Sequence, residues 1–202
     1  RYHNTKEDDW CVGLFGAIDG ATIKNLTLEN VDINVYGGNF GAVAAISDNA
    51  VTFENITIKG DVKLEGTMDY SYSYYIGTIL GTAQGGNSDD DVTLKNITID
   101  VNEGSYVKGR TNIGGVVGCT LGETTITDLK SNIDVFTHNG IAGGIVGRLQ
   151  HNSKIENCVA DGNVTRVNAV SPASDKYRIG GIVGVWESTV GSVELINTEF
   201  NG

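Results

Sequence analysis

The sequence lacks an apolar run of the roughly 18 residues that a membrane-spanning helix needs. Basic residues are also scarce, because 14 Lys and Arg stand against 25 Asp and Glu and give a net charge of −11. Nucleic-acid-binding proteins neutralise phosphates with clustered basic side chains. The sequence therefore predicts neither a membrane span in this segment nor a nucleic-acid partner.

Cysteine is equally scarce. Cys11, Cys119 and Cys158 are too few and too scattered for a disulfide framework or a CxxC zinc site. We interpret them as small buried or half-buried apolar residues. The three histidines share no spacing typical of metal ligands, and no serine stands in a GxSxG context. We therefore predict no catalytic residue and no cofactor.

Long stretches of Ala, Leu, Glu, Lys and Arg, which are typical of helices, are missing, and proline occurs once. Thr, Val, Ile and Asn are common instead, and glycine occurs 28 times, so the composition predicts a β protein. A chain of this length normally forms one domain or one array of repeats, so we expect a single domain over residues 1–202. Because it begins at Arg1 without Met or a signal peptide, we expect it to be part of a longer protein.

A glycine-rich phrase recurs along the chain. A phosphate-binding glycine loop occurs once per domain, between a strand and a helix, so repetition argues against a nucleotide site. We expect these glycines to permit close packing or strained backbone angles. The copies are NIGGVVGC (112–119), IAGGIVGR (141–148) and RIGGIVGV (178–185), with looser ones at 12–17, 40–45 and 76–82.

A second phrase, apolar–x–Asn–apolar–x–apolar, follows each glycine segment. In a straight strand the residues of one face lie two apart, yet here the apolar residues on either side of the Asn lie three apart. We infer that the chain turns a corner at this residue, because Asn and Asp tolerate left-handed backbone angles. The predicted corner residues are Asn25, Asn55, Asn96, Asp128, Asn157 and Asn197.

These repeats predict an all-β fold, a single-stranded parallel β-helix (β-solenoid) of about six coils. One coil cannot bury its apolar face alone, but stacked coils pair each strand with its equivalents above and below. The corner residues should then form a ladder of amide hydrogen bonds. A β-propeller is the competing fold, but its blades need tight hairpins, and Asn-Gly occurs only at 139–140 and 201–202.

The segments GGIVG…KIENCVADGNV (143–164), GGVVG…TITDL and GLFGAIDGATIKNLTLENVDI (13–33) resemble the GLUG-motif repeats of bacterial surface and secreted proteins. Such repeats occur in large adhesins and accompany the catalytic domain of some bacterial immunoglobulin A peptidases. The resemblance implies a right-handed β-helical, non-catalytic module at the cell surface or outside the cell. The zinc motif of the peptidases, HExxH, is absent from this sequence.

Tyrosines gather in one connection between coils, in the stretch MDYSYSYYIG (68–77). If Tyr70, Tyr72 and Tyr74 point outward, together with Tyr75 they offer a platform for sugar rings or for a protein partner. If they point inward, they cover the core of a long connection. A second long connection at 168–177 holds the only proline, and we expect both connections to lie on one flank.

An acidic stretch, GGNSDDDVT (85–93), is the other candidate. Asp89, Asp90 and Asp91 loosely resemble a calcium-binding nonapeptide, but the motif's glycine and tandem copies are missing. A solvated loop that leads into a strand is the simpler interpretation. These aspartates would also be the candidate carboxylates of a polysaccharide lyase or glycosidase built on a β-helix.

Three functions therefore remain open. The first is an adhesin-like surface module that binds host or microbial glycan or protein, the second a passive spacer, and the third a carbohydrate-active enzyme. Both ends of a solenoid expose strand edges and core, so we also expect adjacent domains or end-to-end self-association to cover them.

Overall fold

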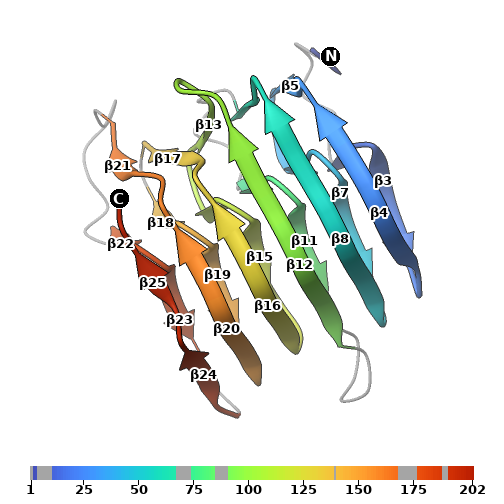
Figure 1. The fold of residues 1–202 in the computed structure, drawn as a ribbon. Helices are drawn as coiled ribbons and strands as arrows, with labels where there is room; N and C mark the ends of the chain where they lie inside the picture. Colours follow the sequence, from blue (N-terminus) through green and yellow to red (C-terminus); the bar gives the residue numbers. More distant parts are fainter. Residues whose placement is uncertain are drawn as a thin grey trace.

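A computed structural model describes residues 2–3, 11–66, 74–84, 91–138, 140–167, 177–187 and 191–202. These residues form 25 strands in four parallel sheets, with one strand or strand pair from each of six coils in every sheet (Figure 1). Each coil visits the sheets in the order A, B, C and D. The predicted all-β parallel solenoid of about six coils is confirmed.

The strands of each sheet follow one another along the stack. Sheet A contains β1 (Tyr2–His3), β5 (Asp32–Val35), β9 (Lys63–Gly66), β13 (Tyr106–Gly109), β17 (Asp134–Thr137) and β21 (Val164–Arg166). Sheet B contains β2 (Cys11–Val12), β6 (Gly38–Gly41), β10 (Tyr74–Gly77), β14 (Ile113–Gly114), β18 (Ile141–Gly143) and β22 (Arg178–Gly180). Sheet C contains β3 (Phe15–Asp19), β7 (Ala44–Asp48), β11 (Leu80–Gln84), β15 (Val117–Thr120), β19 (Val146–Gln150) and β23 (Val183–Glu187). Sheet D contains β4 (Thr22–Glu29), β8 (Val51–Gly60), β12 (Val92–Val101), β16 (Thr124–Ser131), β20 (Ser153–Ala160) and β24 (Val193–Ile196), with β25 (Glu199–Phe200) paired to β20.

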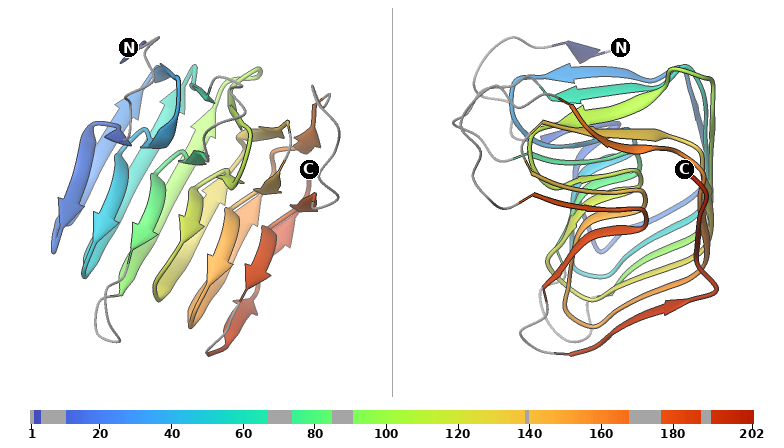
Figure 2. Two further views of the ribbon diagram at one scale, coloured as in Figure 1. Left: turned by 180° about the vertical axis from the view of Figure 1, so that it is seen from behind. Right: turned by 90° about the vertical axis from the view of Figure 1, so that its left-hand side faces the viewer.

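The chain winds in a right-handed sense. In the right-hand view of Figure 2 the C-terminal coil is nearest the viewer, and the chain runs counterclockwise as it advances toward the viewer. Parallel strands joined by crossovers adopt this hand almost without exception, because it follows from the twist of the strands. The handedness implied by the GLUG resemblance is thus present.

The core consists of columns of like residues. Leu94 in β12 pairs with Phe53 on one side and Ile126 on the other, and all three are fully buried. Burying a large apolar side chain stabilises a fold by about 1.5–3 kcal/mol relative to leaving it in water. Because every coil repeats the column, each coil is stabilised mainly by its two neighbours.

The corner residues interrupt this pairing at one point in each coil. All six predicted residues have left-handed φ angles, between 47° and 57°. In sheet D, Lys95 pairs with Thr127 and Ile97 with Leu129, so the ladder skips Asn96 and resumes beyond it. The strand therefore continues through the bend in the first five coils, and only the last coil divides into β24 and β25.

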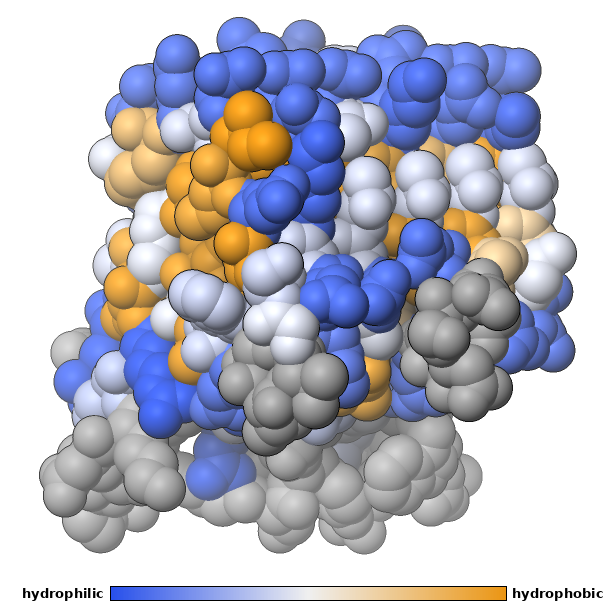
Figure 3. All heavy atoms as spheres, turned by 90° about the horizontal axis from the view of Figure 1, so that it is seen from below, coloured by the Kyte–Doolittle hydropathy of each residue, from blue (hydrophilic) through white to orange (hydrophobic). Residues whose placement is uncertain are grey.

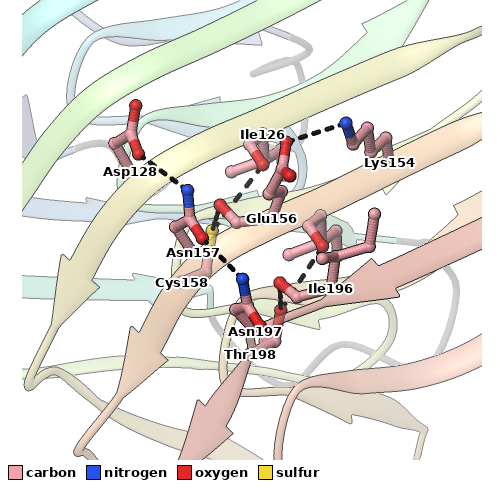
Figure 4. A network of polar contacts seen from close by, with 10 residues as sticks. Ile126, Asp128, Lys154, Glu156, Asn157, Cys158, Ile196, Asn197 and Thr198 are labelled. Atoms are coloured by element: carbon pink, nitrogen blue, oxygen red, sulfur yellow. Dashed lines mark hydrogen bonds and ion pairs between the residues drawn. The ribbon is translucent and has the colours of Figure 1, made fainter.

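Side-chain amides join the corner residues along the stack. Asn55 Nδ2 donates to Asn25 Oδ1 at 2.9 Å, and Asn96 Nδ2 donates to Asn55 Oδ1 at 2.7 Å. Asn157 continues a second series by donating to Asp128 Oδ1 at 3.3 Å, and Asn197 then donates to Asn157 Oδ1 at 3.2 Å (Figure 4). Asp128 has no amide hydrogen to offer Asn96, so the ladder consists of two parts.

The recurring glycines permit sheets B and C to pack backbone against backbone. A Cβ on Gly118 of β15 would lie 2.4 Å from the Ile76 backbone nitrogen in β10, and one on Gly147 of β19 would lie 2.8 Å from Ile113 in β14. The sheet C strands β11, β15, β19 and β23 thus each contact the sheet B strand of the preceding coil. The structure thus confirms that these glycines permit close packing, as expected from the sequence.

Large apolar side chains are exposed at both ends of the stack. They include Leu14 and Phe15 in the first coil and Ile179, Trp186, Leu195 and Phe200 in the last. Seen from below, apolar surface gathers toward the C-terminal coils (Figure 3).

Candidate functional site

The long connections of this solenoid share one place in the coil. Residues 4–10, 67–73 and 167–177 all lead from sheet A to sheet B, a place that we call the A–B junction. The same step takes only residues 36–37, 110–112 and 138–140 in the other coils. Because equivalent strands stack on one another, the anchors of the three long connections lie along one flank, as expected for two of them.

The tyrosine-rich stretch belongs to this junction. Tyr70 and Tyr72 lie outside the described residues, and Tyr74 is described only as the first residue of β10, where it pairs with Gly38. Tyr75 alternates with the buried Ile76 and is itself half-buried. Burial raises the pKa of its phenol, with a further increase from the nearby Cys119. Because neighbouring residues of a strand point to opposite faces and Ile76 points into the core, the ring of Tyr75 faces away from the core.

The acidic stretch lies elsewhere. Asp89 and Asp90 are outside the described residues, whereas Asp91 is exposed just before β12. Residues 85–91 lead from sheet C to sheet D, so the acidic and tyrosine-rich stretches belong to different junctions. Within the described ranges, no group of three or more His, Cys, Asp or Glu side chains is placed to hold a metal ion.

A row of polar side chains follows the line along which sheets B and C meet. We call it the B–C seam. Thr82 Oγ1 donates to Asn39 Oδ1 across this line at 2.9 Å. One coil further on, Tyr75 adjoins Cys119, and the next pair in the same register is Asn112 and Arg148. The polar residues of the seam are Asn39, Tyr75, Asn112 and Arg178 on the sheet B side and Thr82, Cys119 and Arg148 on sheet C. The apolar Ile141 and Val185 occupy the same two columns near the C-terminal end, and Glu187 lies two residues beyond Val185 in β23.

The C-terminal end of the seam is charged. Arg178 Nη1 lies 2.5 Å from Glu187 Oε1, and Arg148 Nη1 lies 3.7 Å from Glu187 Oε2. Between 28% and 43% of each of these three side chains is exposed. Nε of Arg148 is buried without a hydrogen-bond partner, and the buried Asn112 leaves its Oδ1 unpaired.

An arginine stacks on a tyrosine beside this cluster. The Arg166 guanidinium carbon lies 3.7 Å from the centre of the Tyr177 ring. Arg166 ends β21, and Tyr177 directly precedes β22, so the pair spans the two anchors of the longest connection. The guanidinium group thus lies over the face of the ring, where the cation is attracted to the π electrons.

The thiols differ in burial. Burial raises the pKa of Cys119 to about 12 and that of Cys158 to about 11, as expected for small buried residues. Cys11 is exposed, which corrects the expectation that all three are buried or half-buried. It lies in the two-residue strand β2 of the first coil, which has a sheet neighbour on one side only.

A pocket lies where sheet D ends and the chain turns toward sheet A. Its volume is about 250 Å³, and it is lined by Thr98, Ile99, Asp100, Lys130, Asn132 and Asp161. Three of its polar side chains are already paired, because Lys130 contacts Asp161 at 3.4 Å and Asn132 bonds both backbone groups of Val101. These bonds complete the corner between sheets D and A, so the pocket is less suited to a ligand than the seam.

The seam was not recognised from the sequence. Its residues include the first and last positions of the glycine phrase, such as Asn112 and Cys119 in NIGGVVGC. Both of these side chains are buried, so their positions in the sequence do not distinguish them from core positions.

Comparison with known proteins agrees with this architecture. The family model described as the GLUG motif matches residues 138–165, which include β18, β19 and β20. The chain is therefore a parallel β-solenoid with a GLUG motif, as its repeats predict. No solved structure gives a significant match.

Three curated relatives match over most of this chain. They are an immunoglobulin A1 protease of Streptococcus sanguinis (28% identical, 85% of this chain, 8% of that protein), an immunoglobulin A1 protease of Streptococcus pneumoniae serotype 4 (25%, 89%, 8%) and halomucin of Haloquadratum walsbyi (31%, 90%, 2%). The chain thus spans less than a tenth of each relative. None of the described residues forms a helix long and apolar enough to cross a membrane.

Proposed function

We propose that residues 1–202 form one domain of a longer extracellular or cell-surface protein, a non-catalytic, adhesin-like module that binds host or microbial glycan or protein. The observation that carries this proposal is the position of the long connections. The strands that flank the connections at 67–73 and 167–177 place both at the same A–B junction, beside the exposed part of the B–C seam. Long connections on a rigid scaffold are where binding residues concentrate.

The extracellular location follows the GLUG resemblance. It is supported by the matches to segments of proteins named halomucin and immunoglobulin A1 protease. A solenoid suits display, because its stacked coils hold side chains about 4.8 Å apart in fixed rows. Repeating sugar chains present their recognition groups at regular spacing as well.

A glycan array combined with a mucin-binding assay tests the proposal. We expect binding by the chain and at least a tenfold loss in a variant that replaces Tyr70, Tyr72 and Tyr74 by Ala, because aromatic stacking contributes about 0.5–1.5 kcal/mol per ring. A variant with Phe at the same three positions keeps the rings and should retain most of the binding. If the Ala variant binds as well as the wild-type chain, the three tyrosines do not form the binding site.

A passive spacer is the second candidate. The observation that favours it is the unbroken parallel pairing of sheets A to D through all six coils, which makes the module a rod about 25–30 Å long. If a folded chain binds neither a glycan on the array nor mucin, the spacer function explains the module better than the binding function does.

A further inference from the structure

We propose that the arginines at the C-terminal end of the B–C seam bind the carboxylate of an acidic sugar within a glycan chain. This assignment rests on the proposed glycan-binding function and adds the chemical class of the ligand. Its basis is the convergence of Arg148 and Arg178 on a single carboxylate, with a stacked Arg166 beside them.

Arginine is concentrated toward the C-terminal end, although the protein as a whole is acidic. The net charge is −11, yet Arg110, Arg148, Arg166 and Arg178 all belong to the last three coils, and Arg1 is the only arginine outside them. Arg110 and Arg166 follow or end strands of sheet A, and Arg178 begins a strand of sheet B. Three of the five arginines, Arg110, Arg166 and Arg178, thus lie at the A–B junction of these coils.

One carboxylate does not saturate two guanidinium groups. Glu187 carries one negative charge between the two positive charges of Arg148 and Arg178, so this trio has a net positive charge. Each guanidinium group has five N–H donors, and Nε of Arg148 is buried without a partner. Arginine binds carboxylates through two parallel hydrogen bonds, a geometry that a second carboxylate can satisfy.

The neighbouring aromatic rings favour a sugar as the carrier of that carboxylate. Tyr75 is half-buried in the seam and lies close enough to Arg148 for the two groups to interact electrostatically. Arg166 covers one face of the half-buried Tyr177 ring, which leaves only the opposite face for a ligand. Apolar faces of sugar rings stack on such rings while the hydroxyl and carboxylate groups reach the polar side chains. A peptide rich in acidic residues offers carboxylates but no ring of this kind.

The titration of two oligosaccharides that differ only in the acid group tests the assignment. We expect 3′-sialyllactose to bind and lactose to bind at least tenfold more weakly. Arg178→Gln and Arg148→Gln should each weaken the binding of sialyllactose about tenfold or more, because each removes charge-assisted hydrogen bonds to the carboxylate. Added salt should weaken the binding in the same direction.

Glu187→Gln gives the most discriminating result. If Glu187 competes with the ligand for the two arginines, its neutralisation should tighten sialyllactose binding about threefold to tenfold. If the trio were only structural, the same change would leave binding unaltered or weaken it. Lys154→Gln is the matched control, because Lys154 pairs with Glu156 at 2.7 Å on sheet D and should have no effect.

Three outcomes would overturn the assignment. They are equal binding of lactose and sialyllactose, normal binding by a folded Arg178→Gln variant, and preferential binding of a glutamate-rich peptide. The first two leave the proposed glycan-binding function intact. A blank glycan array, by contrast, would reject the proposed function together with this assignment.

Discussion

Asn157 donates its side-chain amide hydrogen to Asp128 Oδ1, whereas Asp128 has no hydrogen to donate to Asn96 in the preceding coil. The two halves of the amide ladder therefore meet at a carboxylate. Asp128 has a φ of 56° and Asn96 a φ of 54°, so the backbone geometry of the corner is the same on both sides. The interruption is chemical and not conformational.

Asp128→Asn should therefore stabilise the protein. It adds the missing donor, and asparagine tolerates the left-handed conformation at least as well as aspartate. We expect an increase of about 1 kcal/mol in the free energy of unfolding, which corresponds to a rise of about 2–4 °C in Tm for a chain of this size. Thermal unfolding followed by circular dichroism measures the change.

The opposite substitution provides the control. Asn96→Asp removes the donor to Asn55 and places a second carboxylate next to Asp128, so it should lower the stability by about 1 kcal/mol or more. An unchanged or lower Tm for the Asp128→Asn variant would contradict this account of the ladder.

Gly118→Ala should be among the most destabilising changes in the glycine phrase. A Cβ at this position would lie 2.4 Å from the Ile76 nitrogen and 2.6 Å from the Gly81 oxygen, and both are backbone atoms. We expect a loss of more than about 2 kcal/mol, because sheets B and C would have to separate. Urea unfolding gives this value from the shift of the midpoint.

Gly16→Ala is the matched change in the first coil, in the equivalent column of sheet C. There the nearest atom, the Cys11 oxygen, lies 3.6 Å from the added Cβ, so we expect less than about 0.5 kcal/mol. Equal losses for the two variants would show that backbone contact between sheets B and C is not the reason for the glycines.

The thiols should react in a fixed order with iodoacetamide at pH 8. Cys11 is exposed and should be alkylated in the native protein, more slowly than free cysteine, because partial burial and Asp48 raise its pKa. Cys119 and Cys158 should react only after unfolding, because both are buried and have pKa values of about 12 and 11. Mass spectrometry of peptides over time distinguishes the three sites. Rapid native alkylation of Cys119 would be incompatible with a closed B–C seam.

The exposed ends should promote association. Trp186 and Leu195 are 56% and 54% exposed in the last coil, where strand edges are also open. We expect the hydrodynamic radius of this chain to increase with concentration and Leu195→Lys to suppress the increase. Leu121→Lys is the control, because Leu121 is 37% exposed but lies in the middle of the stack. This variant should show the same increase in hydrodynamic radius as the wild-type chain. A wild-type chain that stays monomeric at every concentration in dynamic light scattering would reject this expectation.

The corners and the coil count could be predicted because they depend on local chemistry. Phe53 and Ile56 lie three residues apart and both are buried, and Asn55 between them has the left-handed φ that this spacing implies. One residue type at one position in each repeat was enough to locate the bend.

The B–C seam depends on a different kind of relationship. Asn39 contacts Thr82 because a strand of sheet B packs against the sheet C strand of the next coil. This offset of one coil arises from how the two sheets stack in three dimensions, and no pattern along the chain encodes it. For the same reason the sequence could suggest a tyrosine cluster but could not show that Arg148 and Arg178 share Glu187.

Every bond in the amide ladder runs in the same direction, because the later coil always donates and the earlier coil always accepts. A duplicated coil with asparagine at its corner can consequently be inserted between two others, and every amide donor and acceptor of the ladder still has a partner. Gene segments that encode such units are free to multiply in tandem, and the length of the resulting filament becomes a heritable variable. Only a carboxylate at the corner, as at Asp128, breaks that interchangeability.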